Sequence, residues 1–177
     1  PYGGGIKFAY RLSGYLKKKK YIVVNDLKRS DIDVIINISF FPCIYYASSF
    51  SFYDAYLYKI KNKKRKVIII TRINNISSDD KSNIEFYLIK KSIYYSDIVV
   101  FISEWLKKYF IKQIGKQILN KSIVIHNSAD EKIFKKQNNI EKRKKITLVT
   151  HHWSNNYQKG HEVYQMIDDM LSEHKFQ

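Results

Sequence analysis

Cysteine, proline and glycine are scarce in this sequence, and their scarcity limits what the chain can be. Cys43 is the only cysteine among 177 residues, so neither an internal disulfide nor a cysteine-rich metal site can form. We interpret Cys43 as a buried structural thiol in a reducing compartment, with a nucleophilic role as the alternative. With only 2 prolines and 6 glycines, the chain contains no extended low-complexity tract.

Long apolar runs are also missing. No run approaches the roughly 20 residues that a helix needs to span a bilayer, and no secretory signal is visible. The chain begins at Pro1 rather than at a methionine, so we interpret its start as trimmed. We therefore expect a cytoplasmic protein, at most peripheral at the cytoplasmic face of the membrane.

Acidic residues are few, because Asp and Glu number 16 against 32 Lys and Arg, which gives a formal net charge of +16. Such an excess attracts polyanions, namely nucleic acid, anionic lipid or phosphorylated ligands. The alternative is compositional drift in an AT-rich gene, since Ile, Asn, Lys and Tyr are all abundant. The hydrophobic fraction of 45% is enough for a sizeable core and argues against disorder.

Short, β-branched apolar runs alternate with amphipathic stretches. Because the runs are nearly continuous, they predict strands buried on both faces of a parallel sheet. They lie at Tyr21–Val24, Val34–Ile38, Val67–Ile70, Ile98–Ile102, Ile123–Ile125 and Ile146–Val149. Helices are predicted at Ile6–Leu16, Ala47–Ile60, Lys81–Tyr95, Glu104–Ile114 and His161–Leu171. The alternation predicts an α/β fold with a doubly wound parallel sheet.

A polar stretch without apolar periodicity, Lys135–Lys144, predicts a domain boundary. We expect one domain over residues 1–136, a linker over 137–144 and the start of a second domain over 145–177. This second part would hold one strand, one loop and one helix, and such a unit cannot bury a parallel strand on both faces. We therefore expect the second domain to continue beyond Gln177 in the intact protein.

Two loops could carry chemistry. Gly3–Gly5 precede a predicted helix, where glycine lets the backbone approach a phosphate and the helix N-terminus favours negative charge; the alternative is a flexible terminus. Lys145–Gly160 reads as a strand, a polar loop and a helix start, and Lys159 could neutralise a diphosphate; the alternative is a solvated loop. His151 and His152 are adjacent on a strand and point to opposite faces, so we expect no metal site.

Two further segments combine a strand with a polar turn. Ser96-Asp97-Ile98-Val99-Val100, with Ser103 after it, reads as a buried strand that runs into a capped helix. Ile125-His126-Asn127-Ser128-Ala129-Asp130, with Phe134 after it, reads as a strand followed by a turn. In this order and separation they resemble the retaining glycosyltransferases of the GT-B class, the glycogen-synthase-like group 1 family. That family has the motif A-D-x-[IV]-[IV]-x-x-S, followed by [IV]-x-N-G-[IV]-D-x-x-x-F. Its glycine-rich first loop is similar to Gly3–Gly5, and its Lys-Gly pair at the entry to the second lobe is similar to the end of Lys145–Gly160.

The resemblance implies two Rossmann-like lobes that face a cleft. Residues 1–136 would form the N-terminal acceptor lobe, with its first strand missing, and residues 145–177 the first βα unit of a truncated nucleotide-sugar-binding lobe. The implied activity is transfer of a hexose from a nucleoside diphosphate sugar to a glycan, lipid-linked or protein acceptor. It would proceed with retention and without a metal or other cofactor, and residues 1–177 alone would have little activity.

The resemblance also implies a set of binding residues. The donor diphosphate would lie against Gly4, Gly5 and Lys159, since positive charge and helix N-termini stabilise a leaving diphosphate. Further candidate contacts to donor or acceptor are Arg72, Asn74, Ser103, Asn127 and Ser154. For Asn127, a role in forming the turn is the preferred alternative.

The sequence departs from the family pattern at three places. Ser128 replaces the glycine of the N-G-x-D turn, and Arg72-Ile73-Asn74 stands where the family has a histidine near its fourth strand. No copy of the acidic E-x7-E donor motif is present, so the catalytic residues stay unassigned. A non-catalytic scaffold subunit of the same fold is therefore an alternative function.

The lysine runs Lys17–Lys20 and Lys61–Lys66 lead to two hypotheses about partners. They could hold the protein against anionic lipid, near a lipid-linked acceptor, or they could simply be solubilising charge. The rival function is a basic nucleic-acid-binding protein. We disfavour nucleic acid as a partner, because the aromatic residues concentrate around Phe40–Tyr58 rather than between the lysines.

Overall fold

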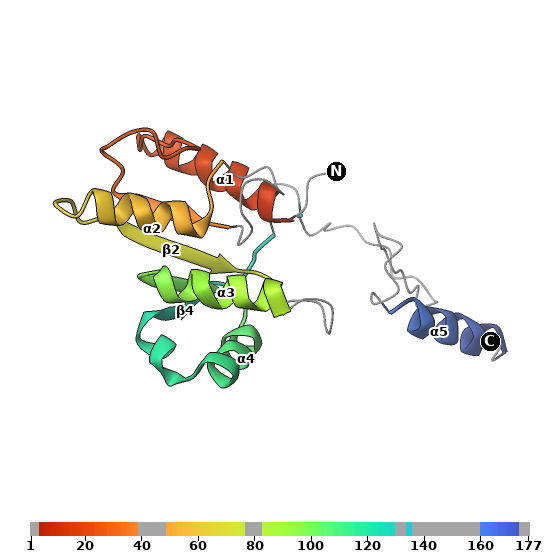
Figure 1. Cartoon of the computed structure of the whole chain (residues 1–177). Coiled ribbons are helices and arrows are strands. Elements are labelled where there is room, and N and C mark those ends of the chain that lie inside the picture. Colours follow the sequence, from red (N-terminus) through yellow and green to blue (C-terminus); the bar gives the residue numbers. More distant parts are fainter. Residues whose placement is uncertain (1–3, 39–48, 77–82, 130–133, 136–159, 174–177) are drawn as a thin grey trace. The chain divides into compact units, whose positions relative to one another are not determined.

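The computed structural model describes residues 4–38, 49–76, 83–129, 134, 135 and 160–173 (Figure 1). The chain divides into two compact units, Pro1–Ala129 and Asp130–Gln177. The division lies nearer the amino terminus than the linker expected at residues 137–144, which are outside the described residues. No helix in the described ranges is long and apolar enough to cross a membrane.

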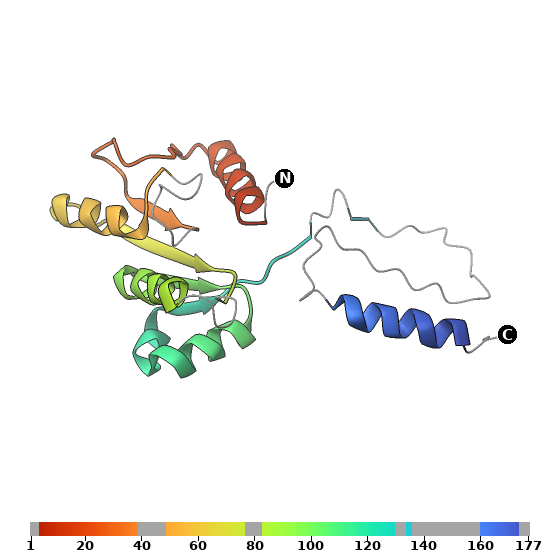
Figure 2. The same ribbon diagram turned by 45° about the vertical axis from the view of Figure 1, so that its right-hand side comes forward.

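The first unit is built on a parallel sheet of four strands in the order β1-β2-β3-β4. Their arrowheads point to the same edge (Figure 2). The strands are β1 (Val34–Asn37), β2 (Ile68–Ile73), β3 (Ile98–Phe101) and β4 (Ser122–Val124). In register, Val34 pairs with Ile68, Ile70 with Ile98 and Val99 with Ser122. The expected α/β fold with a parallel sheet is confirmed, and it is of a Rossmann-like type.

Helices connect each strand to the next. They are α2 (Phe52–Lys61), α3 (Asn83–Tyr95) and α4 (Glu104–Ile114), with a 3₁₀ helix η1 (Lys116–Lys121) before β4. Helix α1 (Gly4–Lys18) precedes the sheet. Most predicted elements are thus present with shifted ends, whereas η1 was not predicted. The strand expected at Ile146–Val149 lies outside the described residues.

The two faces of the sheet are covered unequally. Along β1, β3 and the first half of β2, buried residues alternate with more exposed ones, so the prediction of strands buried on both faces is wrong there. It holds only at the end of β2, where Thr71, Arg72 and Ile73 are all buried. Sequential right-handed crossovers place α2, α3 and α4 on one face. That face carries two apolar clusters, one around Ile35, Ala55 and Ile69 and one around Ile93, Phe101 and Phe110. Alternation puts Thr71 on this face and Arg72 on the opposite one, where α1 lies.

Tyr21–Val24 is not a strand, contrary to the sequence prediction. Tyr21 is 65% exposed and Ile22 77% exposed, and no other strand pairs with them among the described residues. The cause is local, because α1 ends immediately before this segment. Tyr21 N–H still donates to the carbonyl of Leu16 at 3.1 Å as part of the helix terminus. A strand must pair with another strand through backbone hydrogen bonds, whereas the start of this segment bonds to the terminus of α1.

The junction between α3 and β3 is fixed by Ser96 and Asp97. The Asp97 carboxylate accepts from the Ile69 N–H at 2.7 Å, and the Asp97 N–H donates to the Ile69 carbonyl at 2.9 Å. The same carboxylate accepts from the Lys59 ammonium at the end of α2. Ser96 is buried, shares a 2.5 Å hydrogen bond with Thr71 of β2 and donates to the Ser92 carbonyl of α3 at 2.6 Å.

Side chains also complete the helix ends. The Ser51 hydroxyl and the Asp54 carboxylate form a capping box at the start of α2. At the end of α3, the Lys121 ammonium donates to the carbonyls of Ile93, Tyr94 and Ser96, close to the terminus where helix carbonyls run out of intrahelical partners. Burial lowers the pKa of Lys121, while attraction to Asp97 opposes this shift.

The second unit is described chiefly through α5 (His161–Glu173), which confirms the predicted helix after Gly160. Gly160 has a φ of 82°, a conformation that side-chain-bearing residues rarely adopt, and its carbonyl accepts from the Tyr164 N–H at 3.2 Å. Glycine at this position is therefore explained by backbone geometry.

We expect Asp97→Ala to lower the free energy of unfolding by about 2 kcal/mol, because the Ile69 N–H loses a charged acceptor and Lys59 loses its partner. Asp97→Asn keeps an acceptor and should cost less. Urea denaturation measures both. Asp26→Ala is the control, since Asp26 only accepts from Lys28 N–H in an exposed turn, and it should change stability by about 0.5 kcal/mol or less. Equal losses in Asp97→Ala and Asp26→Ala would contradict the role of the junction.

We expect Lys20→Gly to raise the free energy of unfolding by about 1 kcal/mol. Lys20 has a φ of 66° and its N–H donates to the Lys17 carbonyl at 2.9 Å, so it occupies the left-handed position at which a helix commonly ends in glycine. Lys19→Gly removes the same charge from a residue that continues the helical hydrogen bonding, and it should lower stability. A stability change of the same sign in both variants would contradict the conformational argument.

Candidate functional site

The carboxyl edge of the sheet collects most of the described candidate residues. Parallel strands end at this edge and α1 begins there, so the chain between these elements meets in one place. Gly5 of α1 lies against the ends of β1 and β2, because a Cβ added to it would be 3.4 Å from Ile38 and 3.9 Å from Asn74. The structure thus brings Gly5 and Asn74 together, as expected for one site.

Arg72 is the central side chain of this edge. It is only 6% exposed. Its Nη2 donates to the Asn127 side-chain carbonyl at 2.7 Å, and its guanidinium carbon lies 4.1 Å from the centre of the Phe8 ring. Arg72 therefore joins β2, the segment after β4 and α1, on the sheet face that α1 covers.

The second terminal nitrogen of Arg72, Nη1, is buried and has no hydrogen-bond partner among the residues that the structure describes. Arg72 also forms no ion pair within these residues. Burial lowers the pKa of Arg72 below its ordinary value, but a guanidinium keeps its proton throughout the physiological range. A buried cation without a counter-ion is costly, and an anion that contacts Nη1 would remove that cost.

The first turn of α1 adds a second source of positive potential. It contains no acidic side chain that would neutralise the helix dipole. A Cβ added to Gly4 would meet nothing within 4 Å, so the helix begins beside open space. Asn74 directly follows β2, the strand that carries Arg72, and its side-chain amide nitrogen lies beside Gly5. The α1 start therefore lies near the end of the strand that holds the guanidinium.

Ser103 and Asn127 have structural roles at the same edge. The Ser103 hydroxyl accepts from the Leu106 N–H at 3.1 Å and caps α4, which confirms the predicted N-cap. Asn127 is exposed and accepts from Arg72, a role the sequence did not indicate. The neighbouring His126 ring lies 3.1 Å from the Ile102 carbonyl through Nδ1.

Several candidates cannot be placed. Ser154 and Lys159, with the rest of the Lys145–Lys159 loop, and Cys43 lie outside the described residues. Within the described ranges, no three His, Cys, Asp or Glu side chains come together in a group that could hold a metal ion.

Sequence reasoning missed the contact between Phe8 and Arg72. The predicted helix Ile6–Leu16 contains Phe8, but nothing in its pattern indicated that a cation would lie over this ring. The predicted strand Val67–Ile70 ended before Arg72, whereas β2 extends to Ile73 and buries it.

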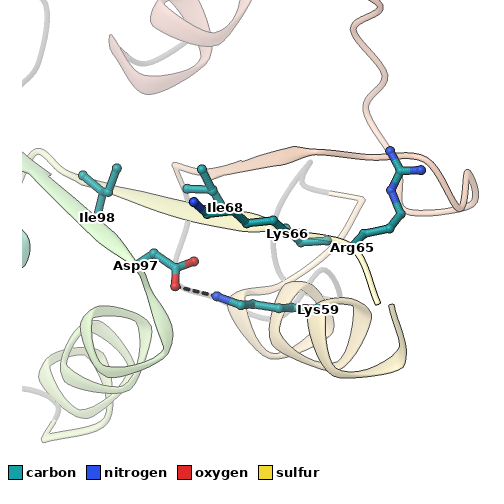
Figure 3. Close-up of a pocket in the computed structure, with 7 residues that line it drawn as sticks. Lys59, Arg65, Lys66, Ile68, Asp97 and Ile98 are labelled. Carbon is teal, nitrogen blue, oxygen red and sulfur yellow. Dashed lines mark hydrogen bonds and ion pairs between the residues drawn. The ribbon is translucent and has the colours of Figure 1, made fainter. Parts of the chain in front are cut away.

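A shallow recess lies at the opposite, amino edge of the sheet (Figure 3). Its volume is about 310 Å³, and Lys59, Arg65, Lys66 and Asp97 contribute to its walls. Lys59 points toward Asp97 and pairs with it (Figure 3). Arg65 forms an ion pair with Asp33 at 2.8 Å. Two of its cations are thus neutralised, so the recess is a weaker candidate for a buried ligand than the Arg72 region.

Comparison with protein-family models, with curated proteins and with solved structures finds no match to this chain. The first unit is therefore defined by its own geometry, as a Rossmann-like parallel α/β unit. Its carboxyl edge combines a helix start that begins with glycine and a buried guanidinium that has no ion pair within the described ranges.

Proposed function

We propose that this chain is part of a nucleotide-sugar-dependent glycosyltransferase that transfers a hexose to a glycan, lipid-linked or protein acceptor. The observation that carries the proposal is the buried Arg72 guanidinium at the edge where α1 begins, whose Nη1 has no hydrogen-bond partner within the described part of the chain. A nucleoside diphosphate sugar supplies an anion of matching chemistry. The motif segments that resemble the group 1 family, around Ser96–Ser103 and Ile125–Asp130, also lead to this edge.

In the proposed reaction, the bond between the anomeric carbon and the diphosphate oxygen breaks, and an acceptor hydroxyl oxygen forms the new bond to that carbon. The hydroxyl proton is released together with the nucleoside diphosphate. Negative charge grows on the diphosphate as it leaves, so donors that are fixed in advance stabilise this stage. The N–H groups of Gly4 and Gly5 and Arg72 Nη1 would supply such donors. Lys159 is proposed to contact the same diphosphate.

We expect Arg72→Met to weaken the binding of inorganic pyrophosphate by roughly 10- to 100-fold, the usual value of a charged hydrogen bond. Isothermal titration calorimetry at physiological salt measures the affinity. Stability should change by only about 1 kcal/mol, because the substitution removes a buried cation along with its contacts.

Lys7→Met is the matched control, since Lys7 is exposed on α1 and carries the same charge. If both variants lose affinity equally, only the overall charge of the protein binds pyrophosphate and Arg72 forms no site. A nucleoside diphosphate hexose should displace pyrophosphate from the wild-type protein. Failure of UDP-, GDP- and ADP-hexoses alike to compete would contradict the proposed donor.

We expect Gly4→Ala to weaken pyrophosphate binding while keeping or raising stability. The added methyl group enters open space beside the helix start, so it meets only a ligand, and alanine is the better helix former. Gly14→Ala is the control, because it makes the same change within α1 and its Cβ also meets nothing within 4 Å, but it lies away from the helix start. Unchanged binding by Gly4→Ala would show that the diphosphate does not approach this turn.

A further inference from the structure

The amino edge of the sheet, opposite the Arg72 region, collects most of the lysine runs of the first unit. In a βα unit the helices end at the edge where the strands begin, so the C-termini of α1 and α2 lie at this edge together with the loop before β1 (left in Figure 1). The cationic edge, as we name it, comprises the exposed side chains of Lys17, Lys18, Lys19, Lys20, Lys28, Lys61, Lys63, Lys64 and Lys66.

The acidic groups of this edge neutralise its arginines rather than its lysines. Arg29 pairs with Asp31 at 2.6 Å, and Arg65 pairs with Asp33 at 2.8 Å. Lys59 pairs with Asp97, and Asp26 accepts from a backbone N–H. Among the described residues, no ion pair involves a lysine of the cationic edge. The charge that remains is a set of exposed ammonium groups, of which Lys19 lies 5.8 Å from the centre of the Tyr15 ring. Ammonium groups suit a diffuse anionic surface better than bidentate recognition.

Exposed apolar side chains adjoin the lysines of α1. Tyr15, Tyr21, Ile22 and Val24 are 59%, 65%, 77% and 41% exposed, respectively. Ile22 and Val24 lie in a segment without regular structure that follows Lys20 directly. Lysines beside exposed aromatic and aliphatic groups are the composition that binds an anionic lipid interface, because the lysines attract the headgroups and the apolar groups enter the boundary.

Lys20 shows that this charge is kept at a cost in stability. Its backbone is left-handed, and glycine would adopt this conformation more easily. A lysine therefore occupies a position at which the helix end alone would favour glycine, next to three other lysines.

We infer that the cationic edge and the Tyr21–Val24 segment dock the protein on an anionic membrane surface, with the carboxyl edge of the sheet turned away from the bilayer. The inference does not depend on the proposed transferase activity, because it uses other residues at the opposite edge. Nucleic acid fits less well, since bases would need aromatic platforms along a cationic groove. Tyr15 and Tyr21 could stack on bases, but the aliphatic Ile22 and Val24 beside them offer no such platform, and Ile22 is the more exposed of the four at 77%.

The first test is co-sedimentation with vesicles of phosphatidylcholine alone or mixed with phosphatidylglycerol. We expect binding only to the mixed vesicles. Replacing Lys17, Lys18, Lys19 and Lys20 by glutamine should weaken this binding at least about tenfold, because each lysine near an anionic surface contributes roughly fivefold. The matched control replaces Lys7, Lys90, Lys91 and Lys108, lysines of α1, α3 and α4 that lie before the last turn of their helices and outside the cationic edge, and has the same net charge. It should bind nearly as well as the wild-type protein.

Three results would overturn the docking surface. Equal losses in both lysine variants would mean that only net charge acts. Equal binding to both kinds of vesicle would show that the protein does not recognise anionic lipid. Binding to single-stranded DNA that persists at several times physiological salt, while vesicle binding does not, would assign the edge to nucleic acid. Ile22→Ser tests the apolar contribution, and it should reduce the vesicle binding that remains at high salt.

The second test examines the orientation through tryptophan fluorescence with brominated phosphatidylglycerol, whose tails quench a nearby indole. Trp153→Phe leaves Trp105, which is 63% exposed at the start of α4, near the carboxyl edge. Trp105→Phe with Trp153→Phe and Ile22→Trp leaves an indole at the cationic edge instead. We expect quenching of the indole introduced at position 22 and little quenching of Trp105. The reverse pattern would contradict the orientation.

Discussion

The carboxylate of Asp97 is the constraint on which the arrangement of the first unit depends. It accepts from Ile69 at the start of β2 and from Lys59 at the end of α2, while its own backbone begins β3. Three elements are thus fixed relative to one another by one side chain. Ser96 adds a small buried contact between Thr71 and α3. Because this junction sets the register of β2 against β3, it also decides which face of the sheet Arg72 occupies.

The two edges of the sheet handle positive charge in opposite ways. At the amino edge, the charges are exposed, and water screens them at little cost to the fold. At the carboxyl edge, Arg72 is buried, and its Nη1 has no partner among the described residues. The cost of burying that cation must be offset by the core clusters on the other face, around Ile69 and Phe101. The first arrangement suits a diffuse partner and the second a small anion.

Much of the fold could be predicted from the sequence, because short β-branched runs that alternate with amphipathic stretches are compatible with few folds other than a parallel α/β sheet. The strand prediction failed for a segment whose composition suits a strand but which follows the end of a helix. Tyr21–Val24 has strand composition, but Lys20 ends a helix there through three-dimensional hydrogen bonds that composition does not report. At the candidate site, the glycine-led helix start was readable. The burial of Arg72 and its contacts with Phe8 and Asn127 join residues far apart in the chain, so no local pattern could reveal them.

Some residues behind the family resemblance have structural roles, and these support the fold rather than the function. Ser96, Asp97 and Ser103, which carry much of the resemblance, pack a helix, fix a strand and cap a helix. Any protein with this strand-helix junction needs residues of these kinds, whatever reaction it catalyses, so these residues support the fold more than the chemistry. Asn127 differs, since it orients a buried cation. Arg72 and the glycines of α1 point to function more directly, because packing alone does not require these residues at their positions.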